Sequence, residues 1–142
     1  MAPGAWPQIV PYLYYPDARA ALDFLTAAFG FEVASAVRDD QGTVWTSTIR
    51  LGDGLVMVGP GLEGFGTAAV ADGALATSRL FVRVDDVDGH HARATGAGAT
   101  VIAPPDEHPG GHRQYVARDP GGHEWIFAQP VEQLGGEDSN PQ

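Results

Sequence analysis

The second half of this chain repeats the pattern of the first half at an offset of 69 positions. Four aligned pairs mark the repeat: Val10 with Arg79, Asp17 with Asp86, Gly52 with Gly121, and Met57 with Ile126. The stretches "IVPYLYYPD" and "SRLFVRVDD" both indicate a short strand that ends in an aspartate. "RLGDGLVMVG" and "RDPGGHEWIFA" both indicate a glycine turn followed by an apolar strand. A repeat constrains the fold strongly, because each copy must form the same supersecondary unit.

Each half of the chain predicts a strand, a helix and three further strands. In the first half, Asp17 is a suitable N-cap and Gly30 a suitable stop for a helix. Three apolar residues between them recur on one helical face: Leu22, Leu25 and Phe29. The expected strands of this half are 8–15, 31–38, 43–51 and 54–58. The second half predicts strands at 79–84, 99–103, 112–118 and 123–128, with a weaker helix over 87–95.

The length of 142 residues and the 44% hydrophobic content predict one domain with a proper core. Within this single domain, unit one is expected at about 8–58 and unit two at about 79–129. The segment 59–78 is rich in glycine and alanine and is expected to be a long connection. The tail 130–142 is expected to be unordered.

The predicted fold class is α+β, with two βαβββ units that form a curved, cup-like mixed sheet with the helices outside. One helix covers one face of each four-stranded sheet, so the other face is left as a trough for a ligand or a partner. Open sheet edges favour a homodimer. The two units either close on each other or exchange with a second chain.

The composition excludes several classes of protein. A formal net charge of -10 argues against a nucleic-acid partner and suits a cationic ligand. The absence of cysteine excludes disulfides, thiolate catalysis and cysteine-based zinc sites. No apolar run approaches the ~20 residues that cross a bilayer, and "MAPGAWPQ" lacks the regions of a signal peptide. We therefore expect a cytoplasmic protein with no membrane partner.

Three stretches resemble the vicinal oxygen chelate superfamily, which includes glyoxalases, bleomycin-resistance proteins and extradiol dioxygenases. They are "VPYLYYPDARAALDFLTAAFGFE", "LFVRVDDVDGHHARATGAGATV" and "RQYVARDPGGHEWIFAQ", and the resemblance covers about Gln8 to Gln129. It implies the fold specifically and the activity only weakly. The superfamily contains isomerases, dioxygenases, thiol transferases and drug-binding proteins without catalytic activity.

In metal-dependent members of this superfamily, the first and last strands of each unit supply the metal ligands. Carried over position by position, these slots are occupied here by Val10, Met57, Arg79 and Ile126. Neither aliphatic nor thioether side chains replace imidazole or carboxylate for such an ion, and an arginine would repel it. We therefore expect no metal and no cofactor. A displaced metal site that uses Glu124 is a weaker alternative.

Strand alternation predicts which side chains line the trough. The candidate ligand-binding residues are Tyr12, Tyr14, Trp45, Met57, Arg79, Phe81, Arg83, His112, Gln114, Glu124 and Ile126. An aromatic and thioether lining with a few polar anchors suits a planar organic ligand. The structural alternative is that these residues fill the trough themselves or pack at a dimer interface. His90 and His91 are expected on the surface, and Phe65, on the connection, is a candidate lid.

The sequence favours a metal-free binding protein of the bleomycin-resistance type, which would sequester an antibiotic or another aromatic metabolite. The expected partner is a small organic molecule, cationic or aromatic. One alternative is a metal-independent isomerase or lyase whose acid–base pair is drawn from Glu124, His112 and the tyrosines. A metal-dependent glyoxalase or dioxygenase is less favoured. A third alternative is a regulatory domain whose trough holds a partner chain.

Overall fold

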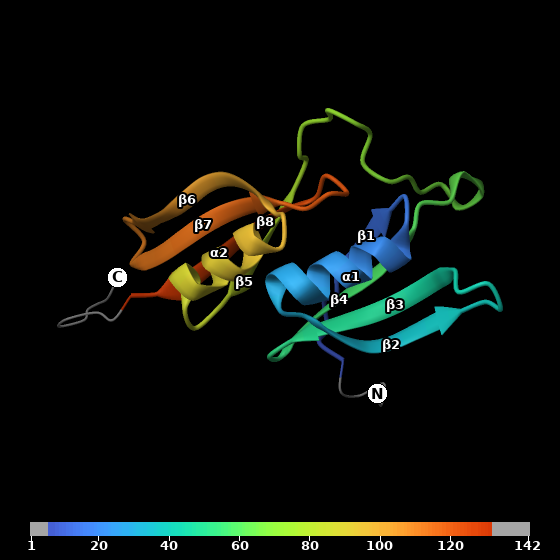
Figure 1. Cartoon of the computed structure of the whole chain (residues 1–142), viewed down its shortest axis with the longest axis horizontal. Coiled ribbons are helices and arrows are strands. Elements are labelled where there is room, and N and C mark those ends of the chain that lie inside the picture. Colours follow the sequence, from blue (N-terminus) through green and yellow to red (C-terminus); the bar gives the residue numbers. More distant parts are fainter. Residues whose placement is uncertain (1–5, 132–142) are drawn as a thin grey trace.

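The computed structural model of this chain describes residues 6–131, and it shows two βαβββ units (Figure 1). Each unit contains one helix and one four-stranded mixed sheet, which confirms the predicted α+β fold class. The expected tail lies almost entirely outside the described residues. Within the described part of the chain, neither helix has the length and apolar character needed to cross a membrane.

Unit one consists of β1 (Tyr12–Tyr15), α1 (Ala18–Phe29), β2 (Glu32–Arg38), β3 (Val44–Leu51) and β4 (Gly54–Pro60), with the strand order β1-β4-β3-β2. β1 runs parallel to β4, and the other pairs are antiparallel. β1 begins four residues later than the expected 8–15, after a segment that contains Pro7 and Pro11. A proline has no N–H to donate to a ladder, which shortens the strand at this end.

Unit two consists of β5 (Arg79–Arg83), α2 (Val87–Gly96), β6 (Thr100–His108), β7 (His112–Arg118) and β8 (Glu124–Pro130), with the equivalent order β5-β8-β7-β6. β6 is longer than expected and passes through Pro104 and Pro105, which an edge strand tolerates. The connection between the units contains one short 3-10 helix, η2 (Glu63–Phe65).

The strand register confirms the sequence repeat. Tyr12 lies opposite Met57 in the parallel pair of unit one. Phe81 lies opposite Ile126 in the parallel pair of unit two. Both partners are displaced by the same 69 positions along the chain, so the two units place equivalent positions at equivalent points of their sheets.

Both helices begin after an aspartate N-cap, and α1 has both of its predicted caps, but the two helices differ in how much they bury. Asp17 accepts a hydrogen bond from the Ala20 N–H at 3.1 Å, and Gly30 ends α1 at φ 84°. Asp86 caps α2 in the same way. The helix α1 buries an apolar stripe of six residues: Ala18, Ala21, Leu22, Leu25, Ala28 and Phe29. The helix α2 buries two: Val87 and Ala94. The first helix therefore contributes most of the helical part of the core.

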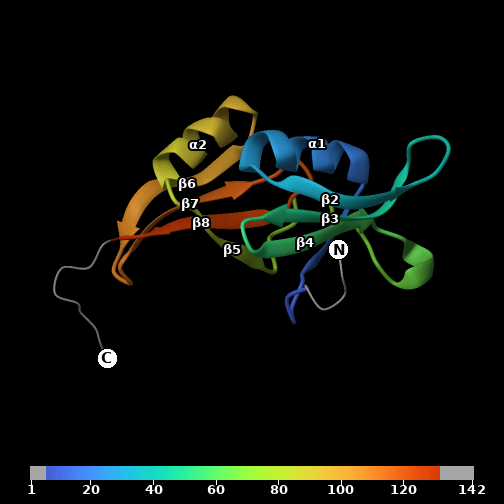
Figure 2. The ribbon, with the colours of Figure 1, turned by 90° about the horizontal axis from the view of Figure 1, so that it is seen from below.

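The two helices lie on the same side of the two sheets (Figure 2). Phe29 of α1 packs against Phe127 of β8, with ring centroids 4.7 Å apart. Phe31 packs against Trp125 at 5.5 Å. Trp125 and Phe127 are fully buried, as the strand alternation predicts. The units therefore share one core, and the opposite face of each sheet has no helix over it.

A buried aspartate joins the two units. Asp119, in the β7–β8 turn, accepts hydrogen bonds from the Tyr15 hydroxyl at 2.6 Å and from Trp125 Nε1 at 3.0 Å. Its other oxygen accepts from the His123 N–H at 3.0 Å. Burial, and then the charge of Asp119, raise the pKa of Tyr15 well above its ordinary range, so the phenol remains a donor.

His90 is also part of this junction, and the prediction that it lies on the surface is wrong. Its Nε2 lies 2.8 Å from the carbonyl of Phe29, and its Nδ1 lies 2.6 Å from the hydroxyl of Tyr115. Because a carbonyl only accepts, Nε2 carries the proton and the Tyr115 hydroxyl donates to Nδ1. Burial lowers the pKa of His90, with a smaller contribution from Arg93, and so favours this neutral form.

Candidate functional site

The uncovered face of unit one, which we call the tyrosine face, is built from β1, β3 and β4. Tyr12 and Tyr14 are half-buried and alternate with the buried Leu13 and Tyr15. The rings of Tyr12 and Tyr14 stack, with centroids 5.0 Å apart. Tyr12 donates a hydrogen bond to Thr46 Oγ1 at 2.9 Å and thereby crosses β4.

A glycine of β4 makes room for this arrangement. A Cβ atom at Gly59 would come within 2.7 Å of the Tyr12 hydroxyl, so a larger residue would displace the ring. Met57 lies beside Tyr12 in the adjacent strand and is half-buried. Around Tyr12 and Met57 this face presents neutral aromatic, hydroxyl and thioether groups. The register places Arg50 of β3 on the same face, where it pairs with Glu32 of β2 at 3.8 Å.

The uncovered face of unit two, which we call the arginine face, carries a row of three charged side chains on adjacent strands. Arg79 of β5 and Arg118 of β7 both lie opposite Glu124 of β8. Arg79 Nε donates to one carboxylate oxygen at 2.8 Å. Arg118 donates to the other oxygen through Nη2 at 2.8 Å and Nε at 3.2 Å. These three residues are called the ion row below.

Glu124 is the centre of the ion row. Its side chain is only 5% exposed, whereas those of Arg79 and Arg118 are 44% and 43% exposed. Hydrogen bonds from Arg118, and then from Arg79, hold the pKa of Glu124 below its ordinary range. The carboxylate is therefore a fixed anion and a weak base.

An apolar row lies next to the ion row on the arginine face. It consists of Phe81, Ile126 and Val116, which face one another across β5, β8 and β7. Phe81 is 61% exposed, which is unusual for a phenylalanine on a sheet face. The next row contains Arg83 and Gln114, and Arg83 makes an exposed ion pair with Asp85 at 3.6 Å.

His112 lies at the end of β7 far from the ion row. Its Nε2 lies 2.7 Å from Gln114 Oε1, and its ring contacts Phe81 edge-on at 5.6 Å. Pro130, the partner of His112, lies six residues after Glu124 on β8, a separation of about 20 Å in a strand. The structure therefore does not bring Glu124 and His112 together as an acid–base pair.

Two further aromatic candidates are Trp45 and Phe65. Trp45 is half-exposed near the β2–β3 turn, where its Nε1 donates to Asp39 Oδ2 at 3.2 Å. Phe65 is 81% exposed on η2 in the connection. The roles of Trp45 at a cup mouth and of Phe65 as a lid stay predictions.

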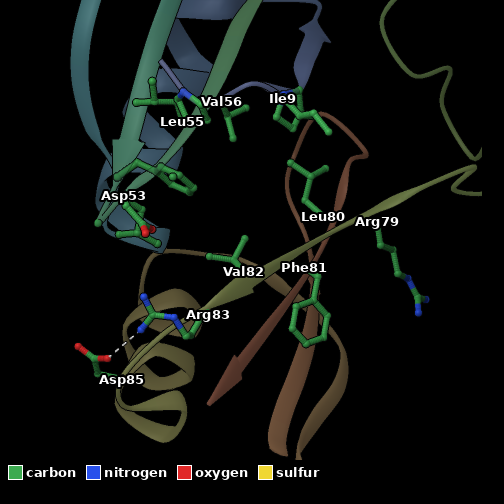
Figure 3. Close-up of a pocket in the computed structure, with 16 residues that line it drawn as sticks. Ile9, Asp53, Leu55, Val56, Arg79, Leu80, Phe81, Val82, Arg83 and Asp85 are labelled. Carbon is green, nitrogen blue, oxygen red and sulfur yellow. Dashed lines mark ion pairs between the residues drawn. The ribbon is translucent and has the colours of Figure 1, made fainter. Parts of the chain in front are cut away.

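An open groove of about 670 Å³ lies between unit one and β5 (Figure 3). Leu80 and Val82 point toward the aliphatic side chains of unit one, whereas the side chains of Arg79 and Phe81, which also line the groove, point away from unit one. The sequence analysis missed this groove because it forms only where the units dock. It also missed the pairing of Arg118 with Glu124, although a tight hairpin around the turn 119–123 places these two residues opposite each other.

Val10, Met57, Arg79 and Ile126 occupy the four positions where the resemblance predicts metal ligands, and their side chains do not fit a divalent ion. Met57 lies beside Tyr12, Ile126 lies beside Phe81, and Arg79 binds Glu124. Among residues 6–131, no group of three or more histidine, aspartate or glutamate side chains is gathered as metal ligands would be. Glu124 would have to release two arginines before it could bind a cation.

The profile of the Glyoxalase/Bleomycin resistance protein/Dioxygenase superfamily matches residues 7–127, and the chain belongs to this superfamily. An uncharacterised protein of Mycobacterium tuberculosis is 30% identical over 137 residues, which are 94% of this chain and 81% of that protein. The crystal structure of TioX from Micromonospora sp. ML1 is similar, with a TM-score of 0.70 and 34% identity, over 90% of this chain and 99% of that one.

TnmS3, an antibiotic-binding protein from Streptomyces sp. CB03234, is also similar in structure. Its TM-score is 0.66 at 23% identity, over 88% of this chain and 98% of that one. At this identity the likeness shows a shared fold.

Proposed function

We propose that this chain binds a planar aromatic small molecule on its uncovered faces and sequesters it without chemical change, as an antibiotic-binding protein does. The observation that carries the proposal is the chemistry of the four family metal positions. Two of them, Met57 and Ile126, present apolar side chains beside Tyr12 and Phe81. A surface of this kind provides stacking and apolar contact for a ring system.

One similarity supports a binding role. TnmS3 is described as an antibiotic-binding protein, and its fold is shared by this chain. TioX, at 34% identity, shares the fold over nearly its whole length. By analogy with TnmS3, we propose that the ligand of this chain is an antibiotic or another aromatic metabolite.

The geometry favours binding over a metal-independent isomerase or lyase. The most buried carboxylate on either face, Glu124, is held by two arginines that lower its pKa, so it is a weak general base. The histidine proposed as its partner, His112, lies at the far end of the sheet.

We further propose that a second copy of the chain completes the binding cup. Both uncovered faces are turned away from the helices, and each is an open surface in a single chain (Figure 2). β1 and β5 are edge strands of their sheets, so each has one side free for another chain. A twofold dimer could place the tyrosine face of one copy opposite the arginine face of the other. Light scattering after size-exclusion chromatography would then give twice the mass of one chain, and a monomer at 100 μM would contradict this arrangement.

Isothermal titration with a panel of aromatic and peptide antibiotics tests the binding function. We expect at least one ligand with a Kd below about 100 μM (roughly -5.5 kcal/mol), unchanged by EDTA. Phe81→Ala should weaken this binding at least several-fold. Leu75→Ala, which removes an exposed apolar side chain from the connection, is the control. No binding by any member of the panel, or equal losses in both variants, would contradict the proposal.

A further inference from the structure

The arginine face has a charge opposite to that of the chain as a whole. The chain carries a formal net charge of -10, but the ion row contains two arginines and one carboxylate. A local excess of one sign determines which ligands a surface attracts, whatever the net charge of the protein. The local charge is therefore the better guide to the ligand.

Glu124 acts as a positioning residue for the two arginines. Each of its carboxylate oxygens accepts from a different guanidinium, at distances of 2.8 Å for the shorter contacts. This fixes both side chains on the face and neutralises only one of their two charges. One positive charge remains on the ion row.

The arginines keep donors available for a ligand. An arginine has five N–H groups, and Arg79 uses only its Nε–H on Glu124. Within residues 6–131, the terminal nitrogens of Arg79 and Nη1 of Arg118 have no hydrogen-bond partner. Both side chains are more than 40% exposed, so these groups face solvent.

Three further acidic residues lie near this face, and none of them pairs with the ion row. Asp85 pairs with Arg83 beyond the opposite end of β5. Asp106 lies opposite Gln114, on the edge strand β6, and accepts from the Glu107 N–H. Asp72 of the connection lines a pocket together with Arg118, but within residues 6–131 no carboxylate other than Glu124 forms an ion pair with Arg79 or Arg118.

We propose that Arg79 and Arg118 form an anion subsite, and that the ligand is an aromatic molecule with a carboxylate or a similar anionic group. The aromatic ring would lie on the apolar row of Phe81, Ile126 and Val116. Adjacent rows on one sheet face are about 6.6 Å apart, which matches the distance between a fused ring system and its acid group. This inference rests on the proposed binding function and reverses the cationic ligand expected from the net charge.

Three naphthalene probes of the same shape test the charge preference: 2-naphthoate, 2-naphthamide and 2-naphthylmethylammonium. Titration calorimetry in 20 mM salt should show that the acid binds about tenfold more tightly than the amide, because it accepts charge-assisted hydrogen bonds. The ammonium should bind most weakly. The preference should shrink in 200 mM salt, because exposed charges are screened.

Arg79→Gln and Arg118→Gln should each remove most of the preference for the acid and leave amide binding within twofold of the original. Arg38→Gln, which makes the same charge change at the end of β2, should leave the preference unchanged. Circular dichroism would confirm that each variant is folded. We use two arginine variants so that, if one of them fails to fold, the other still tests the subsite.

Different failures have different meanings. Amide binding that equals or exceeds acid binding would overturn the anion subsite and leave the binding function standing, provided that Phe81→Ala weakens that binding at least several-fold. The same conclusion would follow if Arg38→Gln changed the preference as much as Arg79→Gln. No binding of any probe at 1 mM would overturn the subsite together with the aromatic-binding function.

Discussion

The tyrosine face and the arginine face occupy equivalent places in a repeated unit, but their chemistry differs. Tyr12 beside Met57 corresponds to Phe81 beside Ile126 in register. At this position unit one presents hydroxyl and thioether groups, and its nearby ion pair, Arg50 with Glu32, is exposed. Unit two instead has the ion row, with a buried carboxylate, next to its apolar row. The backbone repeat thus fixes where side chains lie on each sheet and leaves their polarity free to diverge.

This difference suggests a division of labour between the faces. Under the proposed function, the tyrosine face would offer stacking contacts that tolerate many ring systems, and the arginine face would offer a charge that distinguishes between ligands. We expect the buried junction to hold the two faces in a fixed relation, and we expect the two faces to contribute to the free energy of unfolding through different forces.

The largest effect should come from the buried junction that holds both faces in place. Asp119→Ala removes the acceptor of three hydrogen bonds and leaves buried donors of Tyr15 and Trp125 without a partner. We expect the free energy of unfolding to fall by about 3 kcal/mol or more, measured by urea denaturation. Asp85→Ala, at a fully exposed side chain, is the control. A loss below 1 kcal/mol for Asp119→Ala would mean that the units are held by their apolar core alone.

A smaller and pH-dependent effect is expected on the arginine face. Glu124→Ala should reduce stability at pH 7 by on the order of 1 kcal/mol, because both arginines are partly exposed and can be hydrated again. The pKa of Glu124 is lower in the folded chain than in the unfolded one. Its contribution is therefore present at neutral pH and is lost as the pH falls below its ordinary value and through the folded pKa.

Urea denaturation of the original chain and of Glu124→Ala, repeated at pH 7 and at pH 3, measures this contribution. The difference between them should shrink at the lower pH. A difference that is the same at both pH values would show that Glu124 stabilises the fold by packing and not by charge.

The tyrosine face should respond differently. Tyr12→Phe removes one partly buried hydrogen bond to Thr46 and keeps the ring, so we expect a loss of about 0.5–1 kcal/mol. Because this bond joins two hydroxyl groups and no ion pair, the loss should be the same at low and high salt. A salt-dependent loss for this variant would break the distinction between the two faces.

The smallest effect is expected from His90, at the junction beneath both faces. Its pKa is lowered in the folded chain, so the unfolded chain binds a proton first as the pH falls. Stability should therefore decline as the pH drops through the ordinary histidine range and toward the folded pKa. His90→Gln should flatten this part of the pH profile relative to the original chain. Identical profiles for the two proteins would contradict the assigned neutral form.

The elements that could be predicted from the sequence are those with local signals. Asp17, Gly30 and the apolar stripe between them define α1 without any long-range contact. The direction of Tyr12 or Phe81 follows from the period of two along a strand. The ion row depends on two strand pairings, β5 with β8 and β7 with β8. Only the second pairing, which is a hairpin, has a local signal in the sequence. His90 was placed wrongly because its partners, Phe29 and Tyr115, come from other elements, one of them in the other unit.

Methyl NMR gives the most direct test of the claim that the uncovered faces bind an aromatic molecule. Met57 reports on the tyrosine face, Ile126 on the arginine face, Ile9 on the groove between the units, and Ile49 on the core. On titration with 2-naphthoate, we expect large changes in the methyl chemical shifts of Met57 and Ile126 and small changes for Ile9 and Ile49. Changes that are largest at Ile9, with the signals of Met57 and Ile126 unmoved, would place the ligand in the groove and contradict binding on the uncovered faces.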